Sequence, residues 1–537
     1  MFPSATYLLF GSLITSVLGD EPIVKLSYGS FQGKTTNDVL EFLGIPFAAP
    51  PVGNLRFAPP KNPLKIEGVQ QATAYGPSCP YLIPEGNVPG GGGTPSPMSE
   101  DCLHINVVRP GSIPYGKKLP VVFVGDTSQY PLGSNIVRRS LTLNEPVIFV
   151  SANYRTNAFG FLGGQEVKDA KIANAGLRDQ RFALEWVQKY IGLFGGDRKK
   201  VTLWGESAGA ISVGLQYLLD DGNGYHLFRG GFMQSGVPIV LPDISRHQRF
   251  FDQLVKETNC TGSADKIACL RAASFDDLQA AIGTLPGLFS FQSLELNFQP
   301  NVDGDLIKRD PLTSIIQGQY AKLPFVTGNC EDEGTLFSLA TLNLTTSDQY
   351  IDFIHSRYFE RATAAQIAAL AEAYPDDITQ GSPFNTGTAN ALTPQFKRFA
   401  AIQGDIAFQA PRRFFSKFAA RTQPAWEFRF MARASPPLGF FHGSDVGEFF
   451  GAVQGTKFIG LDALIHFVYF LNPNAPANSI SATRNFTWPR WTPWTPTQSL
   501  FTIIDAEPGF ALTEDTYRKE AMELLNELTI NEIGNGI

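Results

Sequence analysis

The chain has 537 residues, a formal net charge of -7 at pH 7 and a sequence pI near 5.5. This acidic balance argues against nucleic acid or an anionic membrane surface as a partner, because both attract clustered positive charge. A chain of this length usually contains several domains, but no linker-like change in composition divides it. We therefore predict one domain over residues 20–537, preceded by a short leader.

The leader is an apolar run from Tyr7 to Ile14 followed by small residues up to Gly19. This pattern predicts a secretory signal peptide over residues 1–19 and a secreted protein. No later run reaches the ~20 apolar residues that span a bilayer, so no integral membrane segment is expected. Five cysteines suit an oxidising compartment. Three glycosylation sequons agree with passage through the secretory pathway: Asn259, Asn343 and Asn485.

A glycine run at Gly90–Gly93 is the one low-complexity patch in the chain. No apolar strand precedes it and no Gly-Lys-Ser/Thr follows, so it fits neither a phosphate-binding loop nor an oxyanion loop. We interpret it as a flexible surface segment.

Apolar strand candidates alternate along the chain with amphipathic helices such as Arg181–Ile191. This alternation predicts an α/β domain around a large, mostly parallel sheet with helices on both faces. Catalytic groups are then expected on loops at the carboxyl ends of the strands. The strand candidates are Val121–Val124, Val147–Val150, Val201–Trp204, Leu323–Thr327 and Trp426–Phe430.

The segment Gly205-Glu206-Ser207-Ala208-Gly209 directly follows one of these strands and precedes a small, apolar helical stretch. A sharp turn between strand and helix lifts a serine hydroxyl clear of a sheet, and the flanking glycines avoid a Cβ clash in that turn. The alternative is a serine in an ordinary glycine-rich turn. The context favours Ser207 as a nucleophile.

A nucleophilic serine needs a histidine base, and in this type of fold the chain order is serine, acid, histidine. Five histidines follow Ser207. His466 lies in an apolar stretch that is typical of a buried element. His226 and His247 lie beside loop-like or charged sequence and are expected to be solvated. His355 lies in an amphipathic helical stretch. His442 alone belongs to a loop after a strand, so we predict that it is the base.

The acid is expected in the turn Glu331-Asp332-Glu333, which follows the strand ending at Gly328. Acidic residues at such positions often cap helices, and we expect at least two of the three to do only that. Glu333 is the preferred candidate because Gly334 lets the backbone bend beside it.

The Ser207 motif, Glu333, His442 and several further segments resemble the type-B carboxylesterase/lipase family, which includes the cholinesterases. It is similar in particular to secreted fungal lipases of the Candida rugosa type, through residues 285–288, 290–296 and 300–304. The family segments are 42–48, 50–57, 99–103, 174–180, 194–197 and 234–236.

The resemblance implies an α/β-hydrolase fold in which Ser207 forms an acyl-enzyme, His442 is the general acid/base and Glu333 orients it. It also implies the disulfides Cys79–Cys102 and Cys260–Cys269. Cys330 then stays unpaired, and a buried apolar role is favoured over a reactive thiol. No cofactor is implied, and no cysteine-histidine cluster has zinc-ligand spacing.

The chain departs from the family at the oxyanion hole, where a glycine triplet should follow a strand. Pairing without gaps puts Thr127, Ser128 and Gln129 at the triplet. Ala208 is expected to donate its N–H from the turn, whereas donation by Ser128 and Gln129 is in question.

The sequence supports two alternative functions. The first is a secreted serine ester hydrolase acting on a small-molecule ester. The second is a family member with impaired hydrolysis that serves as a binding protein, or as a tailoring or acyl-transfer enzyme in secondary metabolism. The intact Ser207, Glu333 and His442 set favours the first, because binding alone makes no demand on these residues. The altered oxyanion segment is what supports the second. Oligomeric state is left open by the sequence.

Overall fold

The computed structural model describes residues 22–82, 97–125, 132–453, 457–493 and 498–533. The predicted signal peptide, the Gly90–Gly93 run and the segment Thr127–Gln129 lie outside these ranges, so the expectations for them stay predictions. The assignment of residues 20–537 to one domain also stays a prediction. Within the described ranges, no helix has both the length and the apolar character needed to cross a membrane.

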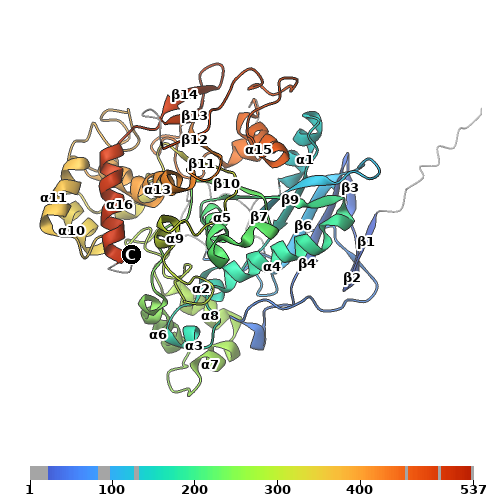
Figure 1. The fold of residues 1–537 in the computed structure, drawn as a ribbon. Helices are drawn as coiled ribbons and strands as arrows, with labels where there is room; N and C mark the ends of the chain where they lie inside the picture. Colours follow the sequence, from blue (N-terminus) through green and yellow to red (C-terminus); the bar gives the residue numbers. More distant parts are fainter. Residues whose placement is uncertain (1–21, 83–96, 126–131, 454–456, 494–497, 534–537) are drawn as a thin grey trace, which may run out of the picture.

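An 11-stranded sheet runs through the middle of the molecule (Figure 1). Its central strands, from β8 across to β13, are parallel, and antiparallel pairs close both edges. The mostly parallel sheet that the sequence predicts is thus confirmed. In spatial order the strands are β14 (Phe510–Glu514), β13 (Ser499–Ile504), β12 (Ala425–Met431), β11 (Phe325–Cys330), β10 (Gly230–Gln234), β9 (Gly196–Glu206), β7 (Leu119–Gly125), β8 (Ile148–Ala152), β6 (His104–Pro110), β4 (Val39–Pro46) and β3 (Lys34–Thr36).

The predicted strands correspond to β7, β8, β9, β11 and β12 in the parallel part of the sheet, although Val147 precedes β8 and Leu323 and Pro324 precede β11. Their continuous apolar runs are typical of parallel strands that are covered on both faces. In β7, for example, every residue from Leu119 to Val124 is buried. A separate small sheet near the N-terminus consists of β1 (Ile23–Leu26), β2 (Gly29–Gln32) and β5 (Val69–Gln71).

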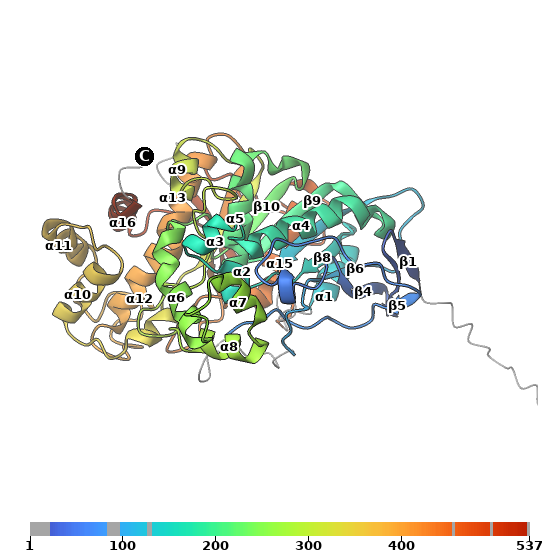
Figure 2. The ribbon, with the colours of Figure 1, turned by 90° about the horizontal axis from the view of Figure 1, so that it is seen from below.

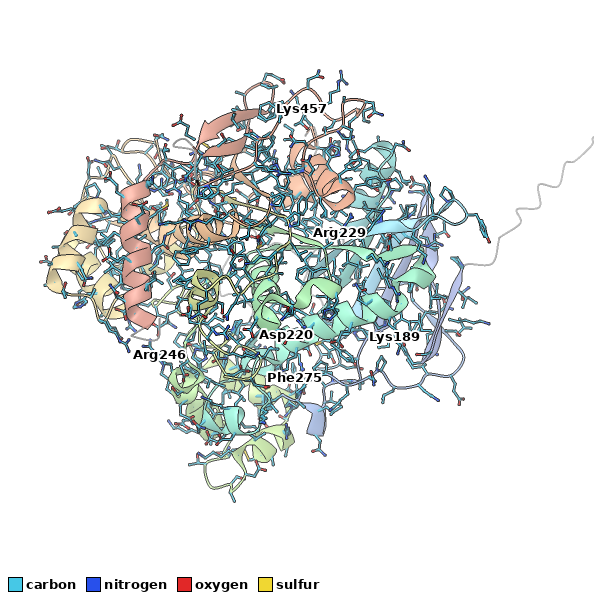
Figure 3. All side chains as sticks on the ribbon, in the orientation of Figure 1. Lys189, Asp220, Arg229, Arg246, Phe275 and Lys457 are labelled. Atoms are coloured by element: carbon cyan, nitrogen blue, oxygen red, sulfur yellow. A yellow bond between two sulfur atoms is a disulfide. The ribbon has the colours of Figure 1, made fainter. Side chains whose placement is uncertain are left out.

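Helices cover both faces of the large sheet. On one face α4, α5, α9 and α13 bury side chains such as Tyr217 and Phe415 against the strands, and on the other face α1, α14 and α15 do so with Phe449 and Leu464. The predicted helix Arg181–Ile191 falls within α4, except for its last residue. Side chains fill the space between helices and sheet (Figure 3). The bounds are α1 (Gly133–Thr142), α4 (Ala175–Tyr190), α5 (Ala208–Leu218), α9 (Pro311–Ile316), α13 (Ala410–Ala419), α14 (Val446–Phe449) and α15 (Ile459–Phe470).

Two further helical groups flank this core (Figures 1 and 2). One packs around Phe251 and Leu254, and the other around Phe353 and Phe399. The first comprises α2 (Asn157–Phe161), α3 (Gln165–Asp169), α6 (Gln248–Glu257), α7 (Lys266–Ala272) and α8 (Phe275–Gly283). The second comprises α10 (Ser347–Arg357), α11 (Ala364–Ala373), α12 (Phe396–Gly404) and α16 (Lys519–Ile533).

Candidate active site

Ser207 lies in a sharp turn between the end of β9 and the start of α5. Its backbone angles are φ 54° and ψ -124°, a conformation that costs a residue other than glycine about 1 to 3 kcal/mol. A Cβ on Gly205 would lie 2.3 Å from the carbonyl carbon of Gly209, so glycine is required there. Gly209 has open space where its own Cβ would be. The clash that we expected at both flanking glycines therefore occurs only at Gly205.

His442 and Glu333 reach this turn from two other loops. His442 Nε2 lies 2.7 Å from Ser207 Oγ, and His442 Nδ1 lies 2.6 Å from Glu333 Oε2. With Nδ1–H donating to the carboxylate, Nε2 is free to accept the serine proton. The second oxygen of Glu333 accepts hydrogen bonds from Ser235 Oγ at 2.6 Å and from the backbone N–H of Cys330 at 2.7 Å. The three residues selected from the sequence thus form one hydrogen-bonded chain.

The other two acids of the turn do not cap a helix, which corrects the expectation from the sequence. The next helical turn begins at Phe337, and its N-cap residue is Leu336, without a side-chain cap. Glu331 instead forms an ion pair of 3.3 Å with Arg429. Asp332 is buried and accepts hydrogen bonds from two neighbouring segments. Both side chains thus contact segments that are distant in the sequence, and local sequence patterns do not reveal such contacts.

The remaining histidines lie apart from Ser207. His226 is exposed, as the sequence suggests, and His355 is an exposed residue of the helix α10, in agreement with the predicted helical stretch. His466 is fully buried in α15, in agreement with the buried element that the sequence indicates, and its Nδ1 pairs with Glu145 at 2.6 Å. His247 is buried rather than solvated, because its ring packs against Phe250, and burial lowers its pKa to about 4.

Three carboxylates, those of Glu333, Glu206 and Asp445, act electrostatically on His442. Glu206 Oε1 lies 3.6 Å from His442 Nε2 and has no hydrogen-bond partner in the described part of the chain. Asp445 accepts a hydrogen bond of 2.9 Å from Gln234. Burial alone lowers the pKa of His442, but the negative charges of Glu333, Glu206 and Asp445 outweigh this and raise that pKa to about 9. Burial raises the pKa of Glu206 to about 7 and that of Asp445 to about 6.

Two aromatic rings pack against the imidazole of His442. The ring centroid of Phe408 lies 4.5 Å from that of His442, and the centroid of Phe337 lies 5.1 Å away. Phe408 belongs to a π-helical turn, Asp405–Gln409, that joins α12 to α13. Such turns are rare and concentrate at functional sites. These rings limit both the rotation of His442 and the approach of water.

The cysteines form two disulfides, Cys79–Cys102 and Cys260–Cys269, which are the pairs that the family resemblance implies. Cys330 is free and fully buried, and burial raises the pKa of its thiol well above the usual value. It therefore behaves as a buried apolar group, as expected. The three sequon asparagines are all exposed.

Ala208 is exposed at the first position of α5, where the backbone N–H groups of a helix have no intrahelical partner. Ser128 and Gln129 lie outside the described residues.

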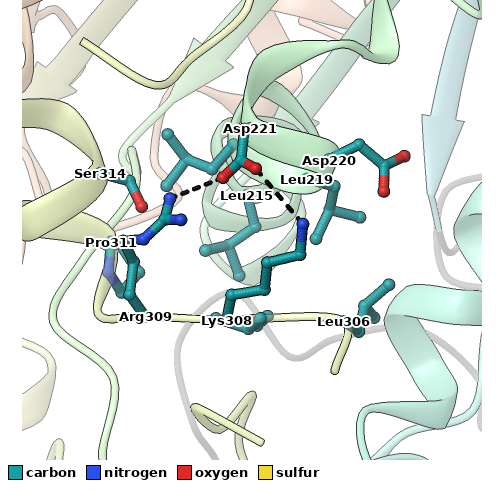
Figure 4. A pocket seen from close by; sticks show the side chains of 11 residues that line it. Leu215, Leu219, Asp220, Asp221, Leu306, Lys308, Arg309, Pro311 and Ser314 are labelled. Atoms are coloured by element: carbon teal, nitrogen blue, oxygen red, sulfur yellow. Dashed lines mark hydrogen bonds and ion pairs between the residues drawn. The ribbon is translucent and has the colours of Figure 1, made fainter. Parts of the chain in front are cut away.

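A surface pocket lies at the other end of α5, roughly 16 Å from Ala208 along the helix at 1.5 Å per residue. The ion pairs of Asp221 with Lys308 and Arg309 lie beside it (Figure 4). This pocket is therefore separate from Ser207.

Comparison with known proteins identifies the family of this chain. The model of the carboxylesterase family matches residues 20–524. The chain belongs to the carboxylesterase family, and it is a carboxylic ester hydrolase with the α/β-hydrolase fold. The family resemblance seen in the sequence is thus confirmed.

Among its relatives is a secreted triacylglycerol lipase of Gibberella zeae, 37% identical over 505 residues, which cover 87% of this chain and 84% of the relative. Lipase 4 of Diutina rugosa is 40% identical over 482 residues, covering 84% of this chain and 86% of the relative. Among solved structures, EstA of Aspergillus niger superposes with a TM-score of 0.80 at 28% identity, covering 95% of this chain and 98% of EstA.

Proposed function

We propose that the protein is a secreted serine esterase that forms an acyl-enzyme on Ser207, with His442 as the general acid/base and Glu333 as the acid that orients it. The observation that carries this proposal is the hydrogen-bonded chain of 2.7 Å and 2.6 Å that joins Ser207 to His442 and His442 to Glu333. Secretion is supported by the names of the relatives, several of which are called secreted lipases. The exposed sequons at Asn259, Asn343 and Asn485 are proposed to carry glycans.

In the acylation step, Ser207 Oγ attacks the carbonyl carbon of the ester while its proton moves to His442 Nε2. The imidazolium that forms is stabilised by Glu333 at Nδ1 and by Glu206, 3.6 Å from Nε2. His442 then donates the same proton to the alcohol oxygen as the carbon–oxygen bond breaks. The alcohol leaves, and the acyl group stays on Ser207.

In the deacylation step, His442 Nε2 accepts a proton from water, whose oxygen attacks the acyl carbon. Collapse of the tetrahedral intermediate returns the proton to Ser207 Oγ and releases the carboxylic acid. In both steps the negative oxygen of the intermediate needs N–H donors. We propose Ala208, and beside it Ser128 and Gln129, as these donors.

The substrate class that we propose is an uncharged carboxylic ester of a small molecule. The relatives are named for lipase and triacylglycerol lipase activity, and the solved neighbours include esterases. A variant of this proposal is a family member with impaired hydrolysis that acts as a binding, tailoring or acyl-transfer protein. It is favoured only by the replacement of the oxyanion glycines by Thr127, Ser128 and Gln129.

A short p-nitrophenyl ester separates these functions. When deacylation is slower than acylation, an acyl-enzyme releases a burst of p-nitrophenol that approaches the enzyme concentration, followed by steady turnover. Ser207→Ala is expected to remove both phases. Ser212→Ala, in the same helix and bonded to Gln180, is the matched control and is expected to retain them. A burst without turnover supports the impaired function, and comparable turnover by Ser207→Ala contradicts the proposal.

A further inference from the structure

The contact between Glu333 and His442 joins two loops that are 109 residues apart in the sequence. Glu333 lies in the acid loop, residues 331–335, and His442 ends the base loop, residues 438–442. The 2.6 Å hydrogen bond between them requires that the loops keep a fixed separation. Glu333 itself faces Ser235 and Cys330 with its other oxygen, so other groups must hold the base loop in place.

Asp332 provides a direct link between these loops. Its side chain is only 2% exposed. Asp332 Oδ2 accepts a hydrogen bond of 2.9 Å from the backbone N–H of Phe440, and the N–H of Asp332 donates one of 3.0 Å to the carbonyl oxygen of Phe440. The backbone bond exists with any residue at this position, but the side-chain bond depends on the carboxylate.

The close fit around this carboxylate shows how tightly the loops meet. Gly439 has φ 66°, and a Cβ there would lie 2.3 Å from Asp332 Oδ2. Thr335 adds a second link, because its Oγ donates to the carbonyl oxygen of Leu438 at 2.8 Å. Asp332 Oδ1 accepts from Ser382 Oγ at 2.7 Å and from the N–H of Phe384 at 3.0 Å.

We propose that Asp332 is a positioning residue for the catalytic triad. With Thr335, it fixes the base loop on the acid loop and so sets the distance between Glu333 and His442. This inference rests on the proposed function of the triad, because Asp332 acts only through that hydrogen bond.

An amide at position 332 cannot replace the carboxylate. The two oxygens of Asp332 each accept from a backbone N–H, one of Phe440 and one of Phe384. Whichever way an amide is turned, its NH2 group therefore faces a backbone donor. The base loop is then expected to shift away from the acid loop, which lengthens the Glu333–His442 hydrogen bond and weakens the contribution of Glu333 to the raised pKa of His442.

The test compares Asp332→Asn with Glu331→Gln in pH profiles of kcat and KM on a short p-nitrophenyl ester. Glu331→Gln is the matched control, because it removes the neighbouring carboxylate, which pairs with Arg429 and not with the base loop. For Asp332→Asn we expect the acidic limb of kcat to move to lower pH by roughly 1 unit and kcat to fall by about 10- to 100-fold, with KM changed less than about twofold. Glu331→Gln should leave the limb in place.

An unshifted limb in folded Asp332→Asn, or an equal shift in Glu331→Gln, contradicts the inference. If Asp332→Asn does not fold, Thr335→Val carries the test, because valine matches the shape of threonine and removes the bond to Leu438. It should move the limb in the same direction, and no movement contradicts the inference. His442→Gln separates the two proposals: activity that survives in this variant refutes the triad itself, whatever Asp332→Asn does.

Discussion

The charge of Glu206 is expected to govern the pH dependence of catalysis. Its Oε1 lies 3.6 Å from His442 Nε2, the same nitrogen that accepts the serine proton. The pKa of Glu206 is about 7 and that of His442 about 9, so Glu206 is already ionised in the range where His442 titrates. Glu206→Gln removes this negative charge and nearly preserves the shape of the side chain.

The size of the effect follows from the distance. Two unit charges 3.6 Å apart attract by roughly 4 to 5 kcal/mol at an effective dielectric constant of about 20. One pKa unit corresponds to about 1.36 kcal/mol, which sets an upper limit of about 3 units. Both charges are spread over several atoms and lie farther apart on average than the two nearest atoms. We therefore expect the pKa of His442 to fall by about 1 to 2 units in Glu206→Gln.

The rates should change in only one part of the pH range. Neutral His442 is the active base, so activity rises with pH through its pKa of about 9 in the wild type. Glu206 stabilises the resting imidazolium and the imidazolium of the transition state to a similar extent. Rates below the limb should therefore coincide in the two proteins, whereas the plateau at high pH should fall about tenfold for each unit of pKa lost.

The assay is kcat/KM on a short p-nitrophenyl ester from about pH 5 to 10, corrected for spontaneous hydrolysis; this ratio reports the pKa values of the free enzyme. Glu185→Gln, which removes an exposed carboxylate from α4, is the matched control and should leave the profile unchanged. If the wild-type profile instead rises near the ordinary histidine pKa and Glu206→Gln does not move it, Glu206 does not control the pKa of His442.

Two further predictions follow from the segments outside the described residues. Replacing Thr127, Ser128 and Gln129 together by glycine should raise kcat on simple esters by roughly tenfold or more if these residues have displaced the oxyanion donors. The substrate range is measured on a panel of esters with different acyl chain lengths. An unchanged kcat with a broader substrate range shows that the donors are already in place. The proline- and glycine-rich stretch between Cys79 and Cys102 cannot sustain an amphipathic helix, so rates on a short-chain ester should rise smoothly with concentration, and a sharp jump at the solubility limit of the substrate would contradict this.

The sequence predicts those parts of the site that depend on local patterns. Ser207 was recognisable because the turn, the strand before it and the helix after it are continuous in the chain. His442 and Glu333 were recognisable because each follows a strand, and parallel strands bring their carboxyl ends to one edge of the sheet. Strands β7, β8, β9, β11 and β12 were found for a similar reason, since burial on both faces leaves an uninterrupted apolar run. Strand β10, which lies between β9 and β11 and begins with two glycines, was not predicted.

Contacts between distant segments were not predictable in this way. Asp332 looked like a helix cap because nothing in the turn indicates that Phe440 and Phe384 would donate to it. Glu206 and Asp445 gave weak signals, one inside the serine motif and one three residues after His442, but their role depends on burial. The edge strand β14 was missed because its residues are half-buried or exposed and lack an apolar run.

Trapping the acyl-enzyme shows directly whether Ser207 carries the acyl group. The enzyme is mixed with a short p-nitrophenyl ester, quenched in acid during the burst and digested, and the acylated peptide is located by mass spectrometry. We expect up to one acyl group per enzyme, on the peptide that contains Ser207, and none in Ser207→Ala. An acyl group on another residue, or an acyl group that is still found in Ser207→Ala, would contradict this expectation.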